Sequence, residues 1–168
     1  MAWKAALLTT AITILSSGCT RPRHAQGPAT DEIKAMAATL RSEGIERIET
    51  LHIPLGQETF GDVTPQTLQN GWHYKTTIRN LPVSSRAALA DVLTTVSVRQ
   101  DSGSVDLRQG VVFYSSKGEM PIGAIYFDRT GRRGVVNSTP VFFETDLLSR
   151  LKKILPLSFE YVGLLRLQ

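Results

Sequence analysis

The chain contains a single cysteine, Cys19, among its 168 residues, so no disulfide bond can form within it. A strong excess of positive charge is also missing. The 19 Lys and Arg residues stand against 15 Asp and Glu residues, and no run of basic residues is longer than two. Nucleic-acid-binding domains normally carry a larger and clustered basic excess, so we expect no nucleic-acid partner.

The sequence also lacks the motifs of common catalytic sites. It has three histidines, but no G-x-S-x-G elbow, H-E-x-x-H helix or phosphate-binding G-x-x-x-x-G-K-[ST] loop. The Asp128–Gly131 tetrapeptide approaches the Asp-Thr-Gly triplet of aspartic proteases, but Arg129 is inserted. Asp at the first position and Gly at the last are typical of a β-turn, which is our interpretation. We therefore expect no catalytic residue, cofactor or metal.

The N-terminal apolar stretch, residues 5–15, is too short to span a bilayer. It has eleven residues, whereas a spanning helix takes about 20. Lys4 precedes it, and the small residues 16–18 lie between it and Cys19. This layout is typical of an export signal. The alternative is a buried N-terminal helix with an incidental cysteine.

The sequence Leu15-Ser16-Ser17-Gly18-Cys19 resembles the lipobox of bacterial lipoproteins, with Ser16 where that family prefers leucine. The resemblance implies that residues 1–18 are a signal peptide and that Cys19 carries palmitate-type acyl chains. Stable anchoring to a membrane takes two membrane-binding groups, such as two acyl chains, so three acyl chains would be sufficient. Thr20 stands where an aspartate commonly marks retention at the inner membrane. The resemblance therefore implies the outer membrane, with the protein facing the periplasm.

Residues 19–29 form the lipidated cysteine and a polar tether without an apolar period. Ten extended residues reach about 35 Å, so the tether would hold the following part just off a membrane surface. Residues 30–168 are long enough to form a single domain with its own core.

Hydrophobic periodicity predicts an α+β fold for this domain. The predicted helices are residues 30–44, 84–96 and 145–155, with one short helical turn between 64 and 71. The predicted strands are residues 45–53, 72–79, 105–115, 121–128 and 133–143. Because the last three strands are joined by tight turns, we expect a mainly antiparallel sheet of about five strands with helices packed on one face.

Burial can also be predicted for several positions. Helical spacing predicts that the buried face of the 84–96 helix consists of Leu89, Val92, Leu93 and Val96. Ile48 and Leu51 do not fall on one face of their strand, which indicates a β-bulge or burial on both sides. Residues 157–168 are apolar with little charge. This composition predicts either an edge strand or an exposed adhesive tail.

The polar sides of two predicted strands, with one nearby turn, supply the candidate binding residues. They are His73, Lys75, Arg79, Asp106, Arg108, Arg129, Arg132 and Arg133. One interpretation is a basic recognition face for an acidic partner, whose charges would set on-rate and specificity. The other is a solvated sheet face. His73 beside Asp106 could form a base–orienter pair, which leaves an enzyme as a further alternative.

These patterns favour a non-enzymatic binding module: a membrane-anchored periplasmic lipoprotein that binds a protein or envelope partner. By analogy with other small anchored lipoproteins, it would be an inhibitor or immunity-type factor. The alternative is a structural or assembly component of a cell-envelope complex, with residues 157–168 as the docking strand. The tract from Asp106 to Gly134 also resembles tracts in small uncharacterised bacterial proteins, a resemblance that implies no activity.

Overall fold

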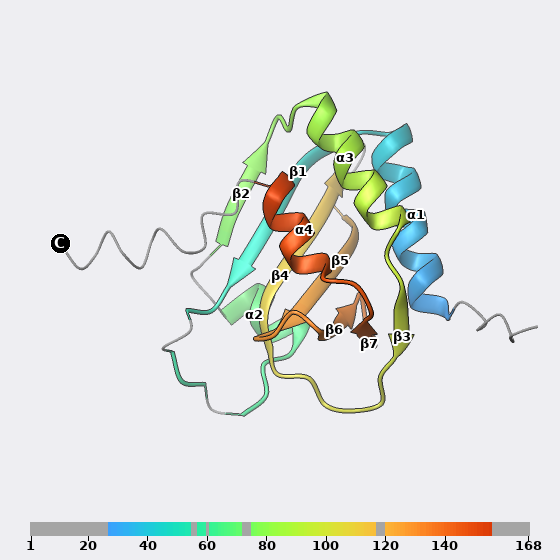
Figure 1. Ribbon diagram of the computed structural model, residues 1–168. Helices are drawn as coiled ribbons and strands as arrows, with labels where there is room; N and C mark the ends of the chain where they lie inside the picture. The colour runs from blue at the N-terminus through green and yellow to red at the C-terminus, as the bar shows by residue number, and fades with distance from the viewer. Residues whose placement is uncertain (1–26, 55–56, 60, 72–74, 117–119, 156–168) are drawn as a thin grey trace, which may run out of the picture.

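The computed structural model describes residues 27–54, 57–59, 61–71, 75–116 and 120–155. Within these residues, four helices and one antiparallel sheet of seven strands form an α+β fold (Figure 1). The helices are α1 (Pro28–Ser42), α2 (Pro65–Gly71), α3 (Val83–Thr94) and α4 (Leu147–Ile154). The strands are β1 (Ile45–His52), β2 (Lys75–Arg79), β3 (Val98–Gln100), β4 (Leu107–Ser115), β5 (Pro121–Asp128), β6 (Arg133–Val136) and β7 (Thr139–Phe143).

The strands lie in the order β2-β1-β4-β5-β6-β7-β3, and every neighbouring pair is antiparallel. Strands β4 to β7 form a meander, in which each strand pairs with the next along the chain. β1 and β2 extend one edge of this meander, and β3 extends the other. β4 and β5 are buried along most of their length, since side chains on both faces of the sheet are covered there.

Helices α1, α3 and α4 cover one face of the sheet, which we call the first face (Figure 1). The stripe predicted for α3 is confirmed. Leu89, Leu93 and Val96 are buried, and Val92 is partly buried against the same core. Full burial of such a side chain contributes about 1.5–3 kcal/mol, so this stripe attaches α3 firmly to the sheet.

The opposite, second face carries a smaller core, covered in part by α2. Its members are Leu51, Ile53, Val63, Leu68, Leu107, Val112, Ala124, Tyr126 and Val135. Ile48 faces the first core and Leu51 the second, and the register of β1 shifts after Ile45. Two-sided burial and a bulge therefore both occur in this strand. The prediction of helices on one face holds for the three longer helices and is wrong for α2.

The sheet has two strands more than the five predicted. The predicted strand over 133–143 is two strands, because Asn137 takes a positive φ of 52° and turns the chain. The Asn137 Oδ1 atom accepts a hydrogen bond from the Ala124 N–H at 2.9 Å, which fixes this turn against β5. β3 is only three residues long, too short for an alternating pattern. It is recruited by pairing of Val98 with Phe143, which lies far away in the sequence.

Three helices begin at residues other than those predicted. α3 runs over Val83–Thr94 instead of 84–96, with Pro82 before its first residue. α1 starts at Pro28, two residues before the predicted start, so Thr30 is buried inside the helix. Proline suits a first helical position because the N–H that it lacks would have no helical partner there. α4 begins at Leu147, two residues after the predicted start, and is capped by Asp146, whose carboxylate accepts the Ser149 N–H at 3.1 Å. The predicted start of α2 is confirmed.

Part of the sequence-based interpretation lies outside the described residues. This holds for the signal peptide, for Cys19, for His73 and for residues 157–168. Among the residues that are described, no helix is long and apolar enough to cross a membrane.

Candidate functional site

The structure separates the predicted binding residues into three groups. Lys75 and Arg79 lie on edge strand β2, whereas Asp106 precedes β4 and Arg108 lies within it. β1 lies between β2 and β4, so the two strands are not neighbours in the sheet. The third group lies at the connection between β5 and β6 and consists of Arg129, Arg132 and Arg133.

Lys75 and Arg79 belong to a polar cluster on the second face, beside the small core. We call it the Glu49 cluster; it consists of Arg47, Glu49, Lys75, Arg79 and Tyr114. The register places Arg47 of β1 opposite both Arg79 of β2 and Tyr114 of β4. Glu49 and Leu51 follow on the same side of β1, and Leu51 belongs to the small core. The cluster therefore adjoins this core.

Glu49 is the centre of the cluster because three donors converge on its carboxylate. Its Oε1 accepts from the Arg47 Nε at 3.3 Å, and its Oε2 accepts from the Lys75 Nζ at 3.2 Å and the Tyr114 hydroxyl at 3.1 Å. The Arg47 guanidinium carbon lies 3.7 Å from the centre of the Tyr114 ring, a cation–π contact. Only 13% of the Glu49 side chain is exposed, against 60% for Arg79.

Glu49 stays ionised in the folded state at neutral pH. Burial raises the pKa of Glu49, but hydrogen bonds from Lys75, Tyr114 and Arg47, together with the charge of Lys75, lower it more, so the net pKa falls below its usual value of 4.5. Burial and the charge of Glu49 raise the pKa of Tyr114, so its phenol stays protonated and donates. Glu46 lies 3.5 Å from Arg79. With Glu46 included, three cations face two carboxylates, which leaves one net positive charge.

Asp106 and Arg108 hold the connection between β1 and α2 against the sheet. Arg108 Nη2 lies 2.6 Å from Asp106 Oδ2, and Asp106 Oδ1 accepts the Val63 N–H at 3.2 Å. Arg108 also donates to the Gln57 carbonyl at 3.2 Å and to the Thr59 hydroxyl at 3.0 Å. Only 11% of the Arg108 side chain is exposed. This pair therefore holds the connection between β1 and α2 in place over the small core, and it does not present its charges to solvent.

Asp128 organises the connection between β5 and β6. Its side chain accepts the Arg133 N–H at 3.3 Å, and its carbonyl accepts the Gly131 N–H at 3.3 Å, where Gly131 has a φ of +73°. This geometry confirms the β-turn interpretation of the tetrapeptide. Arg133 Nε pairs with Asp101 at 2.7 Å. The two exposed arginines of the connection are Arg129 and Arg132.

Sequence reasoning missed the three residues that organise the cluster, which are Arg47, Glu49 and Tyr114. Alternation along 45–53 places positions 47, 49 and 51 on one side, and this signal could have shown that β1 has a polar end. The sequence does not show, however, that β1 lies between β2 and β4. The pairing of β1 with β4 is what brings Tyr114 next to Glu49.

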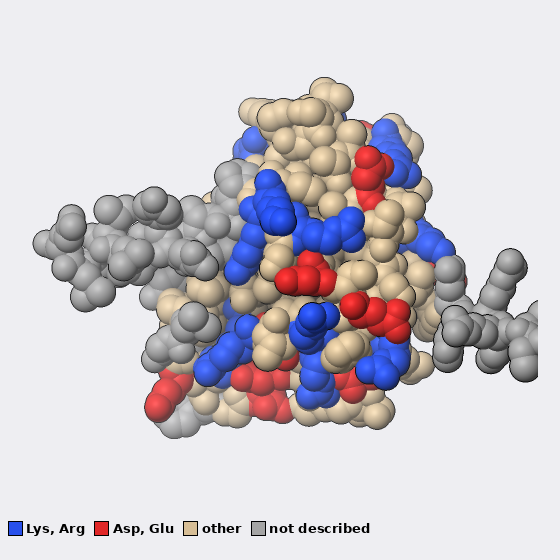
Figure 2. Space-filling model, viewed as in Figure 1, with Lys and Arg blue, Asp and Glu red and all other residues tan. Residues whose placement is uncertain are grey.

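The geometry suits binding, since the cluster offers charged and aromatic side chains held in place by one another. Within the described residues, no group of three or more His, Cys, Asp or Glu side chains could hold a metal ion. On the first face, Lys, Arg, Asp and Glu side chains are interspersed, with no large region of one sign (Figure 2).

Comparison with protein-family models, curated proteins and solved structures finds no match.

Proposed function

We propose that this protein is a membrane-anchored periplasmic lipoprotein whose folded part binds a protein or envelope partner without catalysing a reaction. One observation carries the binding part of the proposal: Arg47 stacks on Tyr114 beside the small core of the second face, next to the exposed Arg79. Arg and Tyr are enriched among the residues that dominate binding energy at protein interfaces.

Internal contacts of the Glu49 cluster support this proposal because they hold its side chains in place before a partner arrives. Glu49 fixes Arg47, Lys75 and Tyr114 through hydrogen bonds. A surface held in this way loses less side-chain entropy on binding. Arg79 extends to solvent, and the net positive charge of the cluster favours an acidic partner by raising the association rate.

The anchor rests on the N-terminal sequence, in which Cys19 follows the apolar stretch and small residues. Lipid at Cys19 and the tether would keep the cluster within reach of other envelope proteins at the outer membrane. By analogy with small anchored lipoproteins, the role is that of an inhibitor or immunity-type factor. Metabolic labelling with a palmitate analogue tests the anchor, since Cys19→Ser should abolish the label. A variant that labels as well as the wild type would contradict it.

Affinity capture of envelope proteins by the full-length protein tests the binding surface. We compare a Lys75→Glu/Arg79→Glu variant, which reverses two charges on the second face, with Lys152→Glu/Lys153→Glu, which makes the same charge change on exposed α4 positions of the first face. The proposal predicts that the first variant alone loses a partner, with an unchanged circular dichroism spectrum. Equal capture by both variants would reject the surface, and loss only on deletion of residues 157–168 would favour an assembly role.

A further inference from the structure

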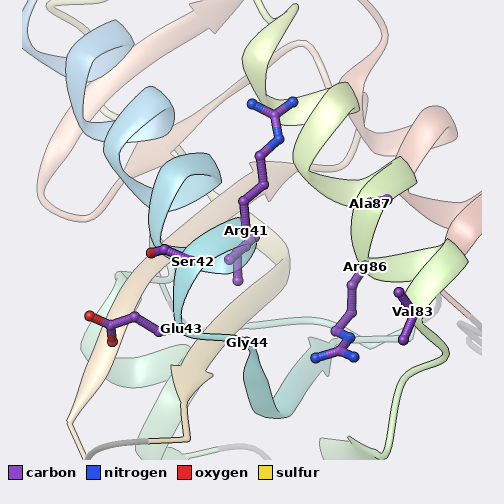
Figure 3. Close-up of a pocket in the computed structure, with 8 residues that line it drawn as sticks. Arg41, Ser42, Glu43, Gly44, Val83, Arg86 and Ala87 are labelled. Carbon is purple, nitrogen blue, oxygen red and sulfur yellow. The ribbon is translucent and has the colours of Figure 1, made fainter.

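A depression of about 370 Å³ lies on the first-face side, between the end of α1 and the beginning of α3. Its lining residues come from the last turn of α1, from the two residues that follow it, and from the beginning of α3 (Figure 3). They are Leu40, Arg41, Ser42, Glu43, Gly44, Val83, Arg86 and Ala87. The Glu49 cluster lies on the other face of the sheet, so the depression is a separate feature.

Arg86 is the one cation of this depression whose guanidinium has no ion-pair or hydrogen-bond partner among the described residues. The side chain is partly buried, and its Nε atom is fully buried. Arg41, by contrast, points away from Arg86 and pairs with Asp91 at 2.6 Å (Figure 3). A guanidinium offers five N–H donors, and a buried donor without an acceptor is destabilising. Because Arg86 also lines the depression, its guanidinium is the group there that can pair with a ligand.

Gly44 allows the Arg86 guanidinium to lie against the backbone at the end of α1. Its φ is +79°, a conformation that glycine takes readily. A Cβ atom at this position would lie 3.1 Å from Arg86 Nη1, closer than side chains normally approach. Figure 3 shows the Arg86 side chain extending from α3 toward the segment beside Gly44. The glycine thus keeps the space around the guanidinium open.

We propose that this depression is a carboxylate-binding site and that Arg86 is the residue that binds the carboxylate. Arginine pairs with carboxylates through two parallel hydrogen bonds. The C-terminal end of α1, where the last helical carbonyls carry partial negative charge, lines the same depression, so a singly charged carboxylate fits better than a doubly charged phosphate. Leu40, Ala87 and the 71%-exposed Val83 offer an apolar wall for the methylene groups of the ligand. This proposal does not depend on the proposed function.

A titration followed by NMR tests the site on the full-length protein. The probes are N-acetylglutamate N-methylamide, whose carboxylate is that of a side chain, and N-acetylglycine, whose carboxylate is that of a chain end. We expect a saturable shift of the Arg86 Nε–Hε signal with at least one of them, and the stronger binder identifies the source of the carboxylate. The neutral N-acetylglutamine N-methylamide and inorganic phosphate at equal ionic strength should give no saturable shift. A shift of equal size with phosphate, or none with either carboxylate, would overturn the proposal.

Two variants separate binding by Arg86 from a general charge effect. Arg86→Gln should weaken carboxylate binding by about 10- to 100-fold, the loss of a charge-assisted hydrogen bond, whereas Arg41→Gln should leave it unchanged. Val83→Glu places an internal carboxylate one helical turn before Arg86, where it can pair with the guanidinium and should block the probes. If Arg86→Gln is unstable, Val83→Glu still decides: unchanged probe binding to this folded variant would overturn the site.

Discussion

At the scale of single residues, Glu49 determines the arrangement of the candidate surface. Its carboxylate accepts hydrogen bonds from Arg47, Lys75 and Tyr114, which lie on three adjacent strands. A carboxylate with several charged or hydroxyl donors is a stronger acceptor than a neutral amide. The conformations of the neighbouring side chains therefore depend on the ionised form of one residue.

Glu49→Gln should reveal this dependence as a change of stability with pH. Burial raises the pKa of Glu49, but the hydrogen bonds of Lys75, Tyr114 and Arg47 and the charge of Lys75 together outweigh it and leave the folded-state pKa lowered. A lowered pKa adds stability above the unfolded-state pKa, and this stability is lost as the pH falls through the folded-state pKa. The free energy of unfolding of the wild type should therefore exceed that of Glu49→Gln most at about pH 6.

Urea unfolding at several pH values measures this difference, with the exposed Glu46→Gln as the control. The advantage of the wild type over Glu49→Gln should shrink as the pH falls below the usual glutamate value of 4.5. A difference that stays constant from about pH 6 to about pH 3 would show that the ionised carboxylate does not stabilise the fold.

At the scale of elements, the two faces of the sheet are covered by different means. The first face is covered by amphipathic helices, whose apolar stripes the periodicity predicts. The second face is covered by the short helix α2 and by a connection that polar contacts hold in place. The two covers should therefore respond differently to substitution.

Leu93→Ala tests the helical cover. Leu93 is 1% exposed in the first core, so its truncation should cost about 2–5 kcal/mol of unfolding free energy. Val92→Ala, on the neighbouring, partly buried position of α3, should cost less. Denaturant unfolding measures both variants. A cost for Leu93→Ala under about 0.5 kcal/mol would contradict the packing of α3.

Arg108→Gln tests the polar cover. This change removes the ion pair with Asp106 and the contacts to the Gln57 carbonyl and the Thr59 hydroxyl, at a cost of about 2 kcal/mol. Hydrogen exchange should increase first at Val63 and in α2, before the first core opens. Arg129→Gln, on an exposed turn, is the matched control. Equal protection of Val63 in both variants would show that the Asp106–Arg108 pair does not hold the connection between β1 and α2 in place.

At the scale of the whole molecule, patterns local in sequence were predicted well, and arrangements between distant segments were not. The bounds of β5 match the prediction, and the α3 stripe is confirmed, because both follow from nearby residues. β3 was missed because its pairing with β7 defines it, and not its own three residues. The candidate binding residues were placed on one face, but the strand order separates them. The Glu49 cluster emerged only from the pairing of β1 with β2 and β4.

Site-specific photo-crosslinking in intact cells tests the central claim, binding through the second face, most directly. A photoreactive residue replaces Thr77, which is exposed opposite Glu49, or Lys152, which is exposed on α4 of the first face. The account predicts a crosslink of defined mass from position 77, none from position 152, and loss of the crosslink on Arg47→Glu. Crosslinks from position 152 alone, or a position-77 crosslink that Arg47→Glu leaves unchanged, would contradict binding through the Glu49 cluster.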